Sequence, residues 1–143
     1  IDMLIEKYAP CGVEIQTDFS SNKTVYTADV LVTDWSSIAF EYSFSTLKPV
    51  LFINTPMKVV NPDYQELTSV PIDLELRDKV GISLNLEEMD RISEAVNTLL
   101  YDNRFAEDSL RDLRDSYIYN VGNSGVVGAK YIINRMIEIA DKK

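Results

Sequence analysis

The sequence predicts an α/β fold in which helices cover a parallel β-sheet. Strand-like and helix-like segments alternate at short spacing over the first 55 residues, a pattern typical of parallel strands joined by crossover helices. Residues 30–33 form an apolar run between two aspartates, as expected for a strand covered on both faces. The length of 143 residues and the apolar content of 45% suit one domain with its own core. We find no internal boundary and expect a single domain over residues 1–143.

The first half of the chain begins with a predicted helix. Met3, Leu4 and Tyr8 suggest this helix, and Pro10 and Gly12 end it. The elements that follow are a strand, a short surface helix, a strand, a helix and a third strand, over residues 13–16, 20–28, 30–33, 36–47 and 50–53.

The second half opens with a long connection without periodicity between residues 54 and 84, which three prolines interrupt. Connections of this length are usually functional or mobile. A short strand is predicted at its end, over residues 80–84. Asn85 then suits an N-cap, and Glu88 completes a capping box. The remaining predicted elements are helices, over residues 85–101, 104–117 and 126–140.

Composition excludes several functions. The chain carries 14 Lys and Arg against 23 Asp and Glu, a formal charge of −9, which argues against binding nucleic acid or an anionic membrane surface. It has no histidine and one cysteine, so acid–base chemistry must use carboxylates or come from elsewhere. The sequence contains no apolar span of about 20 residues, so we expect no direct membrane insertion by this segment. The loop acids Asp63, Asp73, Glu75 and Asp78 lack ligand spacing, and we expect no metal and no cofactor.

One segment carries the pattern of a binding site. Asp34 ends the strand at residues 30–33, and Ser36 and Ser37 follow at the start of the next helix. Ligands of open parallel sheets gather at the carboxyl ends of the strands. A helix N-terminus presents unpaired N–H groups, and two hydroxyls add further donors. These groups can hold a phosphate without Lys or Arg.

Glu41 extends this candidate site. Ser37, Glu41 and Ser45 are four residues apart and share one helix face. A carboxylate about 5–6 Å below a phosphate suits the hydroxyls of a sugar, as in a nucleoside diphosphate with its ribose. The alternative is that Ser36 and Ser37 only cap the helix and that Glu41 is solvated. Spacing alone leaves this alternative ahead.

A family resemblance changes this balance. The run Ala-Asp-Val-Leu-Val-Thr-Asp-Trp-Ser-Ser-Ile-Ala-Phe-Glu at residues 28–41, followed by Leu-Lys-Pro-Val-Leu-Phe at residues 47–52, resembles the C-terminal half of CDP-glycerol glycerophosphotransferases, the teichoic-acid primases and polymerases. Trp35 stands where Tyr is usual. A related form, with Ser-Gly-Gly in place of Trp-Ser-Ser, is found in nucleotide-sugar epimerases and glycosyltransferases of the GT-B architecture.

The resemblance implies one Rossmann-like half of a GT-B fold, with extra C-terminal helices. By that resemblance Ser36 and Ser37 contact the donor phosphates, Glu41 contacts the ribose or glycerol hydroxyls, and Asp34 shapes or hydrogen-bonds the turn. The family's catalytic histidines have no counterpart here, so we expect no catalytic residue in this chain. The chain opens at Ile1 rather than Met, and we expect a fragment that is inactive without the N-terminal half of a longer two-domain transferase.

The expected function is donor binding for a glycerophosphotransferase. The resemblance implies a CDP-glycerol-type donor, attack of an acceptor hydroxyl on its β-phosphate, and release of CMP. The acceptor would be a polyol phosphate or glycolipid in the synthesis of a cell-wall polymer of the teichoic-acid type. The expected location is cytoplasmic, with any peripheral attachment to the inner face of the bacterial membrane carried by other regions. Two alternatives stay open: half of a UDP-sugar GT-B glycosyltransferase or epimerase, and a non-catalytic Rossmann-like interaction domain.

Four further side chains are weaker candidates. Arg77 and Lys79, in the connection after Pro71, are considered as auxiliary cations over a donor phosphate. Trp35 and Tyr64 are considered as stacking partners of the base, although aromatic side chains beside a turn more often pack the domain surface.

Overall fold

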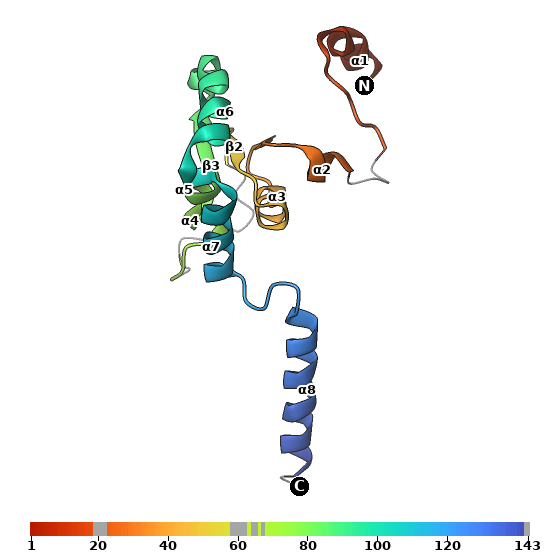
Figure 1. Ribbon diagram of the computed structural model, residues 1–143, viewed down its shortest axis with the longest axis vertical. Coiled ribbons are helices and arrows are strands. Elements are labelled where there is room, and N and C mark those ends of the chain that lie inside the picture. Colours follow the sequence, from red (N-terminus) through yellow and green to blue (C-terminus); the bar gives the residue numbers. More distant parts are fainter. Residues whose placement is uncertain (19–22, 58–62, 64–65, 67, 142–143) are drawn as a thin grey trace.

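The computed structural model describes residues 1–18, 23–57, 63, 66 and 68–141. Its elements, drawn in Figure 1 and with 3-10 helices marked η, are α1 (Asp2–Tyr8), η1 (Ala9–Cys11), α2 (Lys23–Thr27), β1 (Leu31–Thr33), α3 (Ile38–Thr46), β2 (Val50–Asn54), α4 (Ile72–Glu75), α5 (Arg77–Val80), β3 (Gly81–Asn85), η3 (Leu86–Arg91), α6 (Ile92–Tyr101), η4 (Asn103–Phe105), α7 (Glu107–Tyr117) and α8 (Ser124–Ala140).

The sheet has three parallel strands in the order β1-β2-β3. Leu31 of β1 pairs with Val50 of β2, and Val50 pairs in turn with Gly81 of β3. The central strand β2 thus lies between the strand that precedes it in the sequence and the strand that follows it. The carboxyl ends of all three strands therefore meet at one edge. The α/β fold with a parallel sheet and flanking helices is confirmed, and it has the form of a Rossmann-like half domain.

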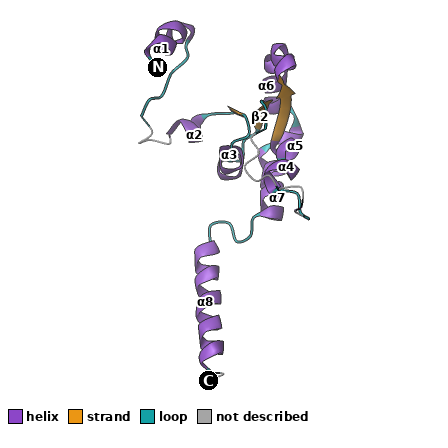
Figure 2. Ribbon diagram, turned by 180° about the vertical axis from the view of Figure 1, so that it is seen from behind, coloured by secondary structure: helices purple, strands orange, loops and turns teal. Residues whose placement is uncertain are grey.

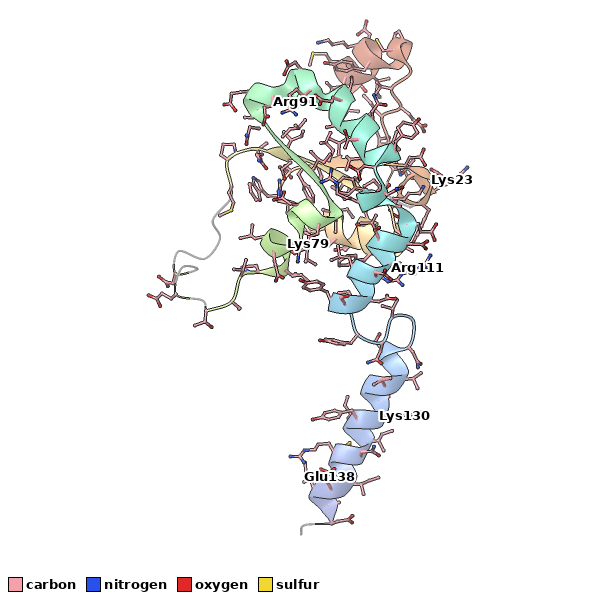
Figure 3. All side chains as sticks on the ribbon, turned by 60° about the vertical axis from the view of Figure 1, so that its left-hand side comes forward. Lys23, Lys79, Arg91, Arg111, Lys130 and Glu138 are labelled. Carbon is pink, nitrogen blue, oxygen red and sulfur yellow. The ribbon has the colours of Figure 1, made fainter. Side chains whose placement is uncertain are left out.

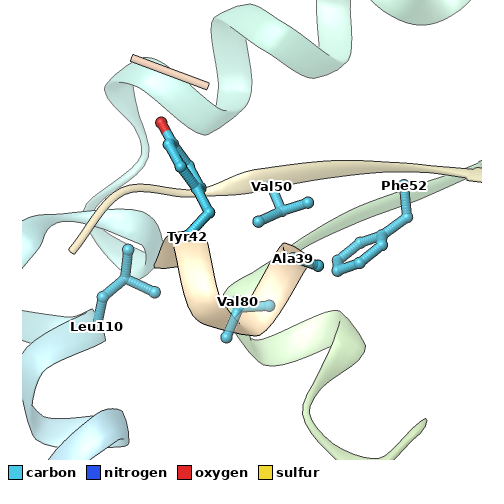
Figure 4. Close-up of a cluster of buried hydrophobic side chains, with 6 residues drawn as sticks. All are labelled: Ala39, Tyr42, Val50, Phe52, Val80 and Leu110. Carbon is cyan, nitrogen blue, oxygen red and sulfur yellow. The ribbon is translucent and has the colours of Figure 1, made fainter. Parts of the chain in front are cut away.

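Each face of the sheet is covered by a separate apolar cluster, because successive side chains of β2 point to opposite faces. One cluster lies between the sheet, α3, α5 and α7, and Figure 4 shows its buried members Ala39, Tyr42, Val50, Phe52, Val80 and Leu110. The second lies against α6 and η4, and its buried members are Leu51, Leu84, Ala95, Leu99 and Phe105. This two-sided core fixes β2 and β3 and places their ends at the edge described above.

Gly81 is required where β3 meets β2. A Cβ atom at residue 81 would collide with the carbonyl oxygen and carbon of Val50. The φ of Gly81 is −171°, which is ordinary extended backbone that any residue adopts. The reason for glycine is thus the close approach of two strands, which brings Asn54 and Asn85 into register at the far end of the pair.

Two predictions about strands need correction. Residues 13–16 have no regular secondary structure, because no strand in the described part of the chain lies beside them to complete a ladder. The strand predicted at residues 30–33 forms as β1, yet it is not covered on both faces. It is an edge strand, and the side chain of Val32 is 53% exposed.

The long connection predicted between residues 54 and 84 is partly helical. It contains α4 and α5, each of four residues, and these are too short to give a periodic signal. The remaining helices lie where they were predicted, except that the helix predicted over residues 85–101 begins as the 3-10 helix η3 and becomes α-helical only at Ile92. The capping box of Asn85 and Glu88 is present at the start of η3.

Helices α1 and α8 stand apart from the α/β body in both Figure 1 and Figure 2. Neither helix has a buried residue. The large apolar side chains of α8 that are exposed are Val126, Val127, Tyr131, Ile132, Ile133, Met136, Ile137 and Ile139. Among the described helices, none combines the length and the apolar character that a membrane span requires.

Candidate functional site

The carboxyl edge of the sheet is held together by Arg77, from α5. Its Nη1 donates a hydrogen bond to the backbone carbonyl of Asp34, directly after β1, at 3.1 Å. Its Nη2 donates to Oδ1 of Asn54, the last residue of β2, at 3.0 Å. Asn54 Nδ2 in turn donates to Oδ1 of Asn85, the last residue of β3, at 3.0 Å. One guanidinium thus connects the ends of all three strands.

The same guanidinium lies between two aromatic rings. Its Cζ is 3.9 Å from the ring centroid of Trp35 and 4.1 Å from that of Phe52, which belongs to the core. Trp35 is fixed further by its Nε1, which donates to the carbonyl of Thr55 at 2.6 Å. Arg77 is 7% exposed, and burial lowers the pKa of its guanidinium below the ordinary value of arginine, against the opposite effect of Asp78 and Asp34.

The structure therefore corrects the interpretation of Arg77 as an auxiliary cation above a donor phosphate. Both terminal nitrogens are bonded within the chain, and the group is inside the α/β body. Trp35 likewise stacks on the guanidinium. No spacing in the sequence signals this contact, because Arg77 lies 42 residues after Trp35 in a stretch without periodicity.

The turn between β1 and α3 presents free hydrogen-bond donors. The backbone N–H groups of Trp35, Ser36 and Ser37 donate no hydrogen bond to any of the described residues. Ser36 Oγ accepts from the N–H of Ile38 at 3.4 Å, which is long, and Ser37 is the N-cap of α3 without a side-chain cap bond. Ser36 and Ser37 are both exposed. Three successive N–H groups and two hydroxyls are thus open to a ligand.

Asp34 and Glu41 are exposed carboxylates, and neither has a hydrogen-bond partner among the described residues. Asp34 contributes its backbone carbonyl to the contact with Arg77, in the turn that the sequence analysis assigned to it. Glu41 lies on α3, four residues after Ser37, and borders an apolar hollow of about 400 Å³ against Arg114 and Ile118. Neither Asp34 nor the two serines line this hollow, so the structure places Glu41 one turn away from the donors and not in the same pocket.

Lys79 is engaged elsewhere. Its Nζ donates to the hydroxyl of Tyr117 at 3.0 Å and lies 3.7 Å from Glu75, and the Tyr117 hydroxyl donates to Glu75 at 2.6 Å. The hydrogen bond with Tyr117 raises the pKa of Lys79 above its ordinary value. Figure 3 labels this side chain on its short helix, α5. Lys79 therefore pairs with α4 and α7 and is not brought to residues 34–37. Tyr64 lies outside the described residues.

No group of three or more Asp, Glu, Cys or His within the described ranges is arranged to hold a metal ion. At the sheet edge, the backbone groups left without a partner in the turn at residues 35–37 are hydrogen-bond donors. Their chemistry suits an anionic ligand.

The fold and the edge together define an α/β protein with a Rossmann-like half domain, whose first strand end offers unpaired donors to an anion. The chain belongs to the CDP-glycerol:poly(glycerophosphate) glycerophosphotransferase family, whose model matches residues 11–119. No curated protein and no solved structure matches the chain. The match includes all three strands and α3 to α7, and it ends before α8. The family predicted from residues 28–52 is thereby confirmed, and membership indicates a function of the CDP-glycerol glycerophosphotransferase type.

Proposed function

We propose that this chain is the donor-binding half of a glycerophosphotransferase and that residues 34–37 bind the diphosphate of CDP-glycerol. The observation that carries the proposal is the row of three N–H groups without acceptors, with two hydroxyls, at the end of a parallel strand. Family membership supplies the class of donor.

These donors suit a phosphate for electrostatic reasons. The N-terminus of α3, a helix of nine residues, carries the positive end of a helix dipole. Backbone N–H groups at such a terminus bind anions without any basic side chain. A chain with a formal charge of −9 can therefore hold a diphosphate locally.

Glu41 would then bind hydroxyls of the ribose or of the glycerol. It lies four residues, about 6 Å along the helix axis, from Ser37. Its carboxylate is exposed and has no partner in the described part of the chain, so it is free to accept from a sugar or glycerol hydroxyl. Asp34 would shape the turn through its backbone.

In the proposed reaction an acceptor hydroxyl attacks the β-phosphorus of the donor. The new bond joins the acceptor oxygen to that phosphorus, the bond to the bridging oxygen breaks, and CMP leaves with the bond's electron pair. The acceptor's proton passes to a base outside this chain, since the chain has no histidine. Residues 34–37 would orient the diphosphate and stabilise its growing charge.

The wider setting is part of the same proposal. The parent enzyme would have a GT-B arrangement, with the base in the other half, and would act in the cytoplasm at the inner face of the membrane. Its acceptor would be a polyol phosphate or glycolipid, as in the synthesis of a polymer of the teichoic-acid type.

The test is isothermal titration of the folded chain with CDP-glycerol, CDP and UDP. We expect CDP-glycerol and CDP to bind, and the double variant Ser36→Ala, Ser37→Ala to bind CDP at least about tenfold more weakly, because each lost bond to a charged group is worth about 1.5–3 kcal/mol. Ser93→Ala, at an exposed serine of α6, is the control and should bind as the wild type does.

Absence of heat with millimolar CDP-glycerol, in a chain shown to be folded by circular dichroism, would overturn the proposal. Preference for UDP would favour a nucleotide-sugar enzyme. An interaction domain predicts that the double variant alters stability by about 1–2 kcal/mol while no nucleotide binds before or after.

A further inference from the structure

We infer that Arg77 is the positioning residue of the phosphate-binding turn and that it governs affinity for the diphosphate without touching it. This inference rests on the proposed function of residues 34–37. By this inference the buried side chain of Arg77, 42 residues after Trp35 in the sequence, controls the orientation of the backbone N–H groups of residues 35–37.

Arg77 Nη1 donates a hydrogen bond to the Asp34 carbonyl at 3.1 Å. That carbonyl and the N–H of Trp35 belong to one peptide unit, and this N–H is the first of the three free donors. A bond from a charged donor fixes the plane of the peptide and polarises it, which makes its N–H a stronger donor. Arg77 thereby acts on a donor of the site through the peptide bond.

The guanidinium of Arg77 also stacks on the ring of Trp35. The guanidinium Cζ lies 3.9 Å from the centroid of this ring and 4.1 Å from the ring centroid of the core residue Phe52. Trp35 also donates to Thr55, beyond the end of β2. The residue that carries the first free N–H is therefore held from both its backbone and its side chain, and the support extends into the core.

The charge of the guanidinium is also incompletely paired within the described part of the chain. Both acceptors of Arg77 are neutral, a carbonyl and an amide oxygen, and its Nε is buried without a hydrogen-bond partner among the described residues. A buried cation is usually paired with an anion, because desolvation of an unpaired charge is unfavourable. Among the described residues no carboxylate hydrogen-bonds to the guanidinium, and Asp78 and Asp34 act on it only through space. An anion arriving at residues 34–37 would complete the pairing across one peptide unit.

A purely structural role gives a different expectation. If Arg77 served only to fill the space between Trp35 and Phe52, an unbranched apolar side chain of similar length would replace it without loss of affinity, and buried ion pairs are often replaced in this way. The inference predicts that such a replacement keeps the fold and loses the ligand.

The experiment compares wild type, Arg77→Met and Arg77→Lys in the full chain by titration with CDP, at a temperature where thermal unfolding shows each variant to be folded. Arg77→Met is expected to weaken binding at least tenfold, and Arg77→Lys, which keeps the charge but not the planar stack, to recover part of the loss. Leu99→Ala is the matched control, because it removes a buried side chain from the opposite face and should lower the unfolding temperature without changing affinity.

A second measurement, by NMR, does not depend on CDP binding to any variant. The Nε–H resonance of Arg77, identified by its absence in Arg77→Met, should shift when CDP is added to the wild type, since the unpaired Nε belongs to the group that supports the turn. A wild type that binds no CDP would contradict the proposed function itself. A wild type that binds CDP with an unmoved Arg77 resonance, or a folded Arg77→Met that binds equally well, would overturn the role of Arg77 alone.

Discussion

Individual buried polar groups in the α/β body are incompletely paired. Besides Arg77, the hydroxyl of Ser43 is fully buried and has no partner among the described residues. It lies on α3, the helix that begins at the candidate site. A buried hydroxyl without a partner lowers stability, because the water it loses is not replaced.

We therefore predict that Ser43→Ala increases the free energy of unfolding by about 1 kcal/mol, from removal of the unpaired group and from the higher helix propensity of alanine. Urea denaturation followed by circular dichroism measures the change. Ser45→Ala on the exposed face reports the propensity effect alone. Equal gains in the two variants, or a loss in Ser43→Ala, would show that burial of the hydroxyl carries no penalty.

Residue roles could be predicted from sequence only where the partner is near in the chain. Asn85 and Glu88 are three residues apart, and their capping box is present as predicted. The site turn at residues 34–37 also lies where the strand–serine–helix pattern placed it. The buried role of Arg77 could not be predicted, because its partners, Asp34, Trp35 and Asn54, come from two strand ends that only the folded sheet brings together.

At the scale of elements, the capping box links the start of η3 to the sheet edge. The N–H and Nδ2 of Asn85 both donate to Glu88, at 3.1 and 2.9 Å, and Asn85 also accepts from Asn54, which contacts Arg77. The bond from the Asn85 backbone lowers the pKa of Glu88 below its ordinary value of 4.5, and Arg91 acts in the same direction.

This shift predicts a pH-dependent contribution to stability. A carboxyl with a lowered pKa in the folded state stabilises the fold above the unfolded pKa, near 4.5, and loses that effect as the pH falls through the folded value. Thermal unfolding of wild type and Glu88→Gln should therefore differ at pH 7 and converge toward pH 3. Glu87→Gln in the same turn is the control. A difference between wild type and Glu88→Gln that is constant across this range would contradict the assignment.

Prediction of elements succeeded where the signal is local and failed where it depends on neighbours. Helix α3 and strands β2 and β3 have their own apolar pattern and their own breakers. Residues 13–16 have an alternating pattern as well, but no neighbouring strand pairs with them in the described part of the chain, so the pattern alone produced no strand. The four-residue helices α4 and α5 are shorter than any periodicity that a sequence can display.

For the whole molecule, the contrast lies between the packed α/β body and helix α8. The helix of 17 residues has no buried residue and follows the end of the family match at residue 119. Its apolar side chains therefore contribute nothing to the core of the body as it stands in Figure 1.

A chain that ends at residue 123 should thus unfold within about 4 °C of the full chain and bind CDP with the same affinity, since removal of exposed groups changes stability by about 0.5 kcal/mol or less. Circular dichroism melting at matched concentration measures the unfolding temperature, and isothermal titration measures the affinity for CDP. A chain that ends at residue 106 is the control, because it loses α7 and the buried Leu110, and it should not fold. If the chain that ends at residue 123 melts at a much lower temperature than the full chain, this would show that α8 packs on the body.

Strand β1 has three residues, lies at the edge of the sheet and is half open on one face, and the candidate donors follow it directly. Short edge strands open locally more readily than central ones. A ligand that requires all three donors binds only while β1 is paired, so its apparent dissociation constant is the intrinsic one divided by the fraction of time for which the strand is closed. Affinity for the donor and local folding of the first strand are in this way one coupled equilibrium, and bound ligand would slow amide exchange in β1 more than in β2.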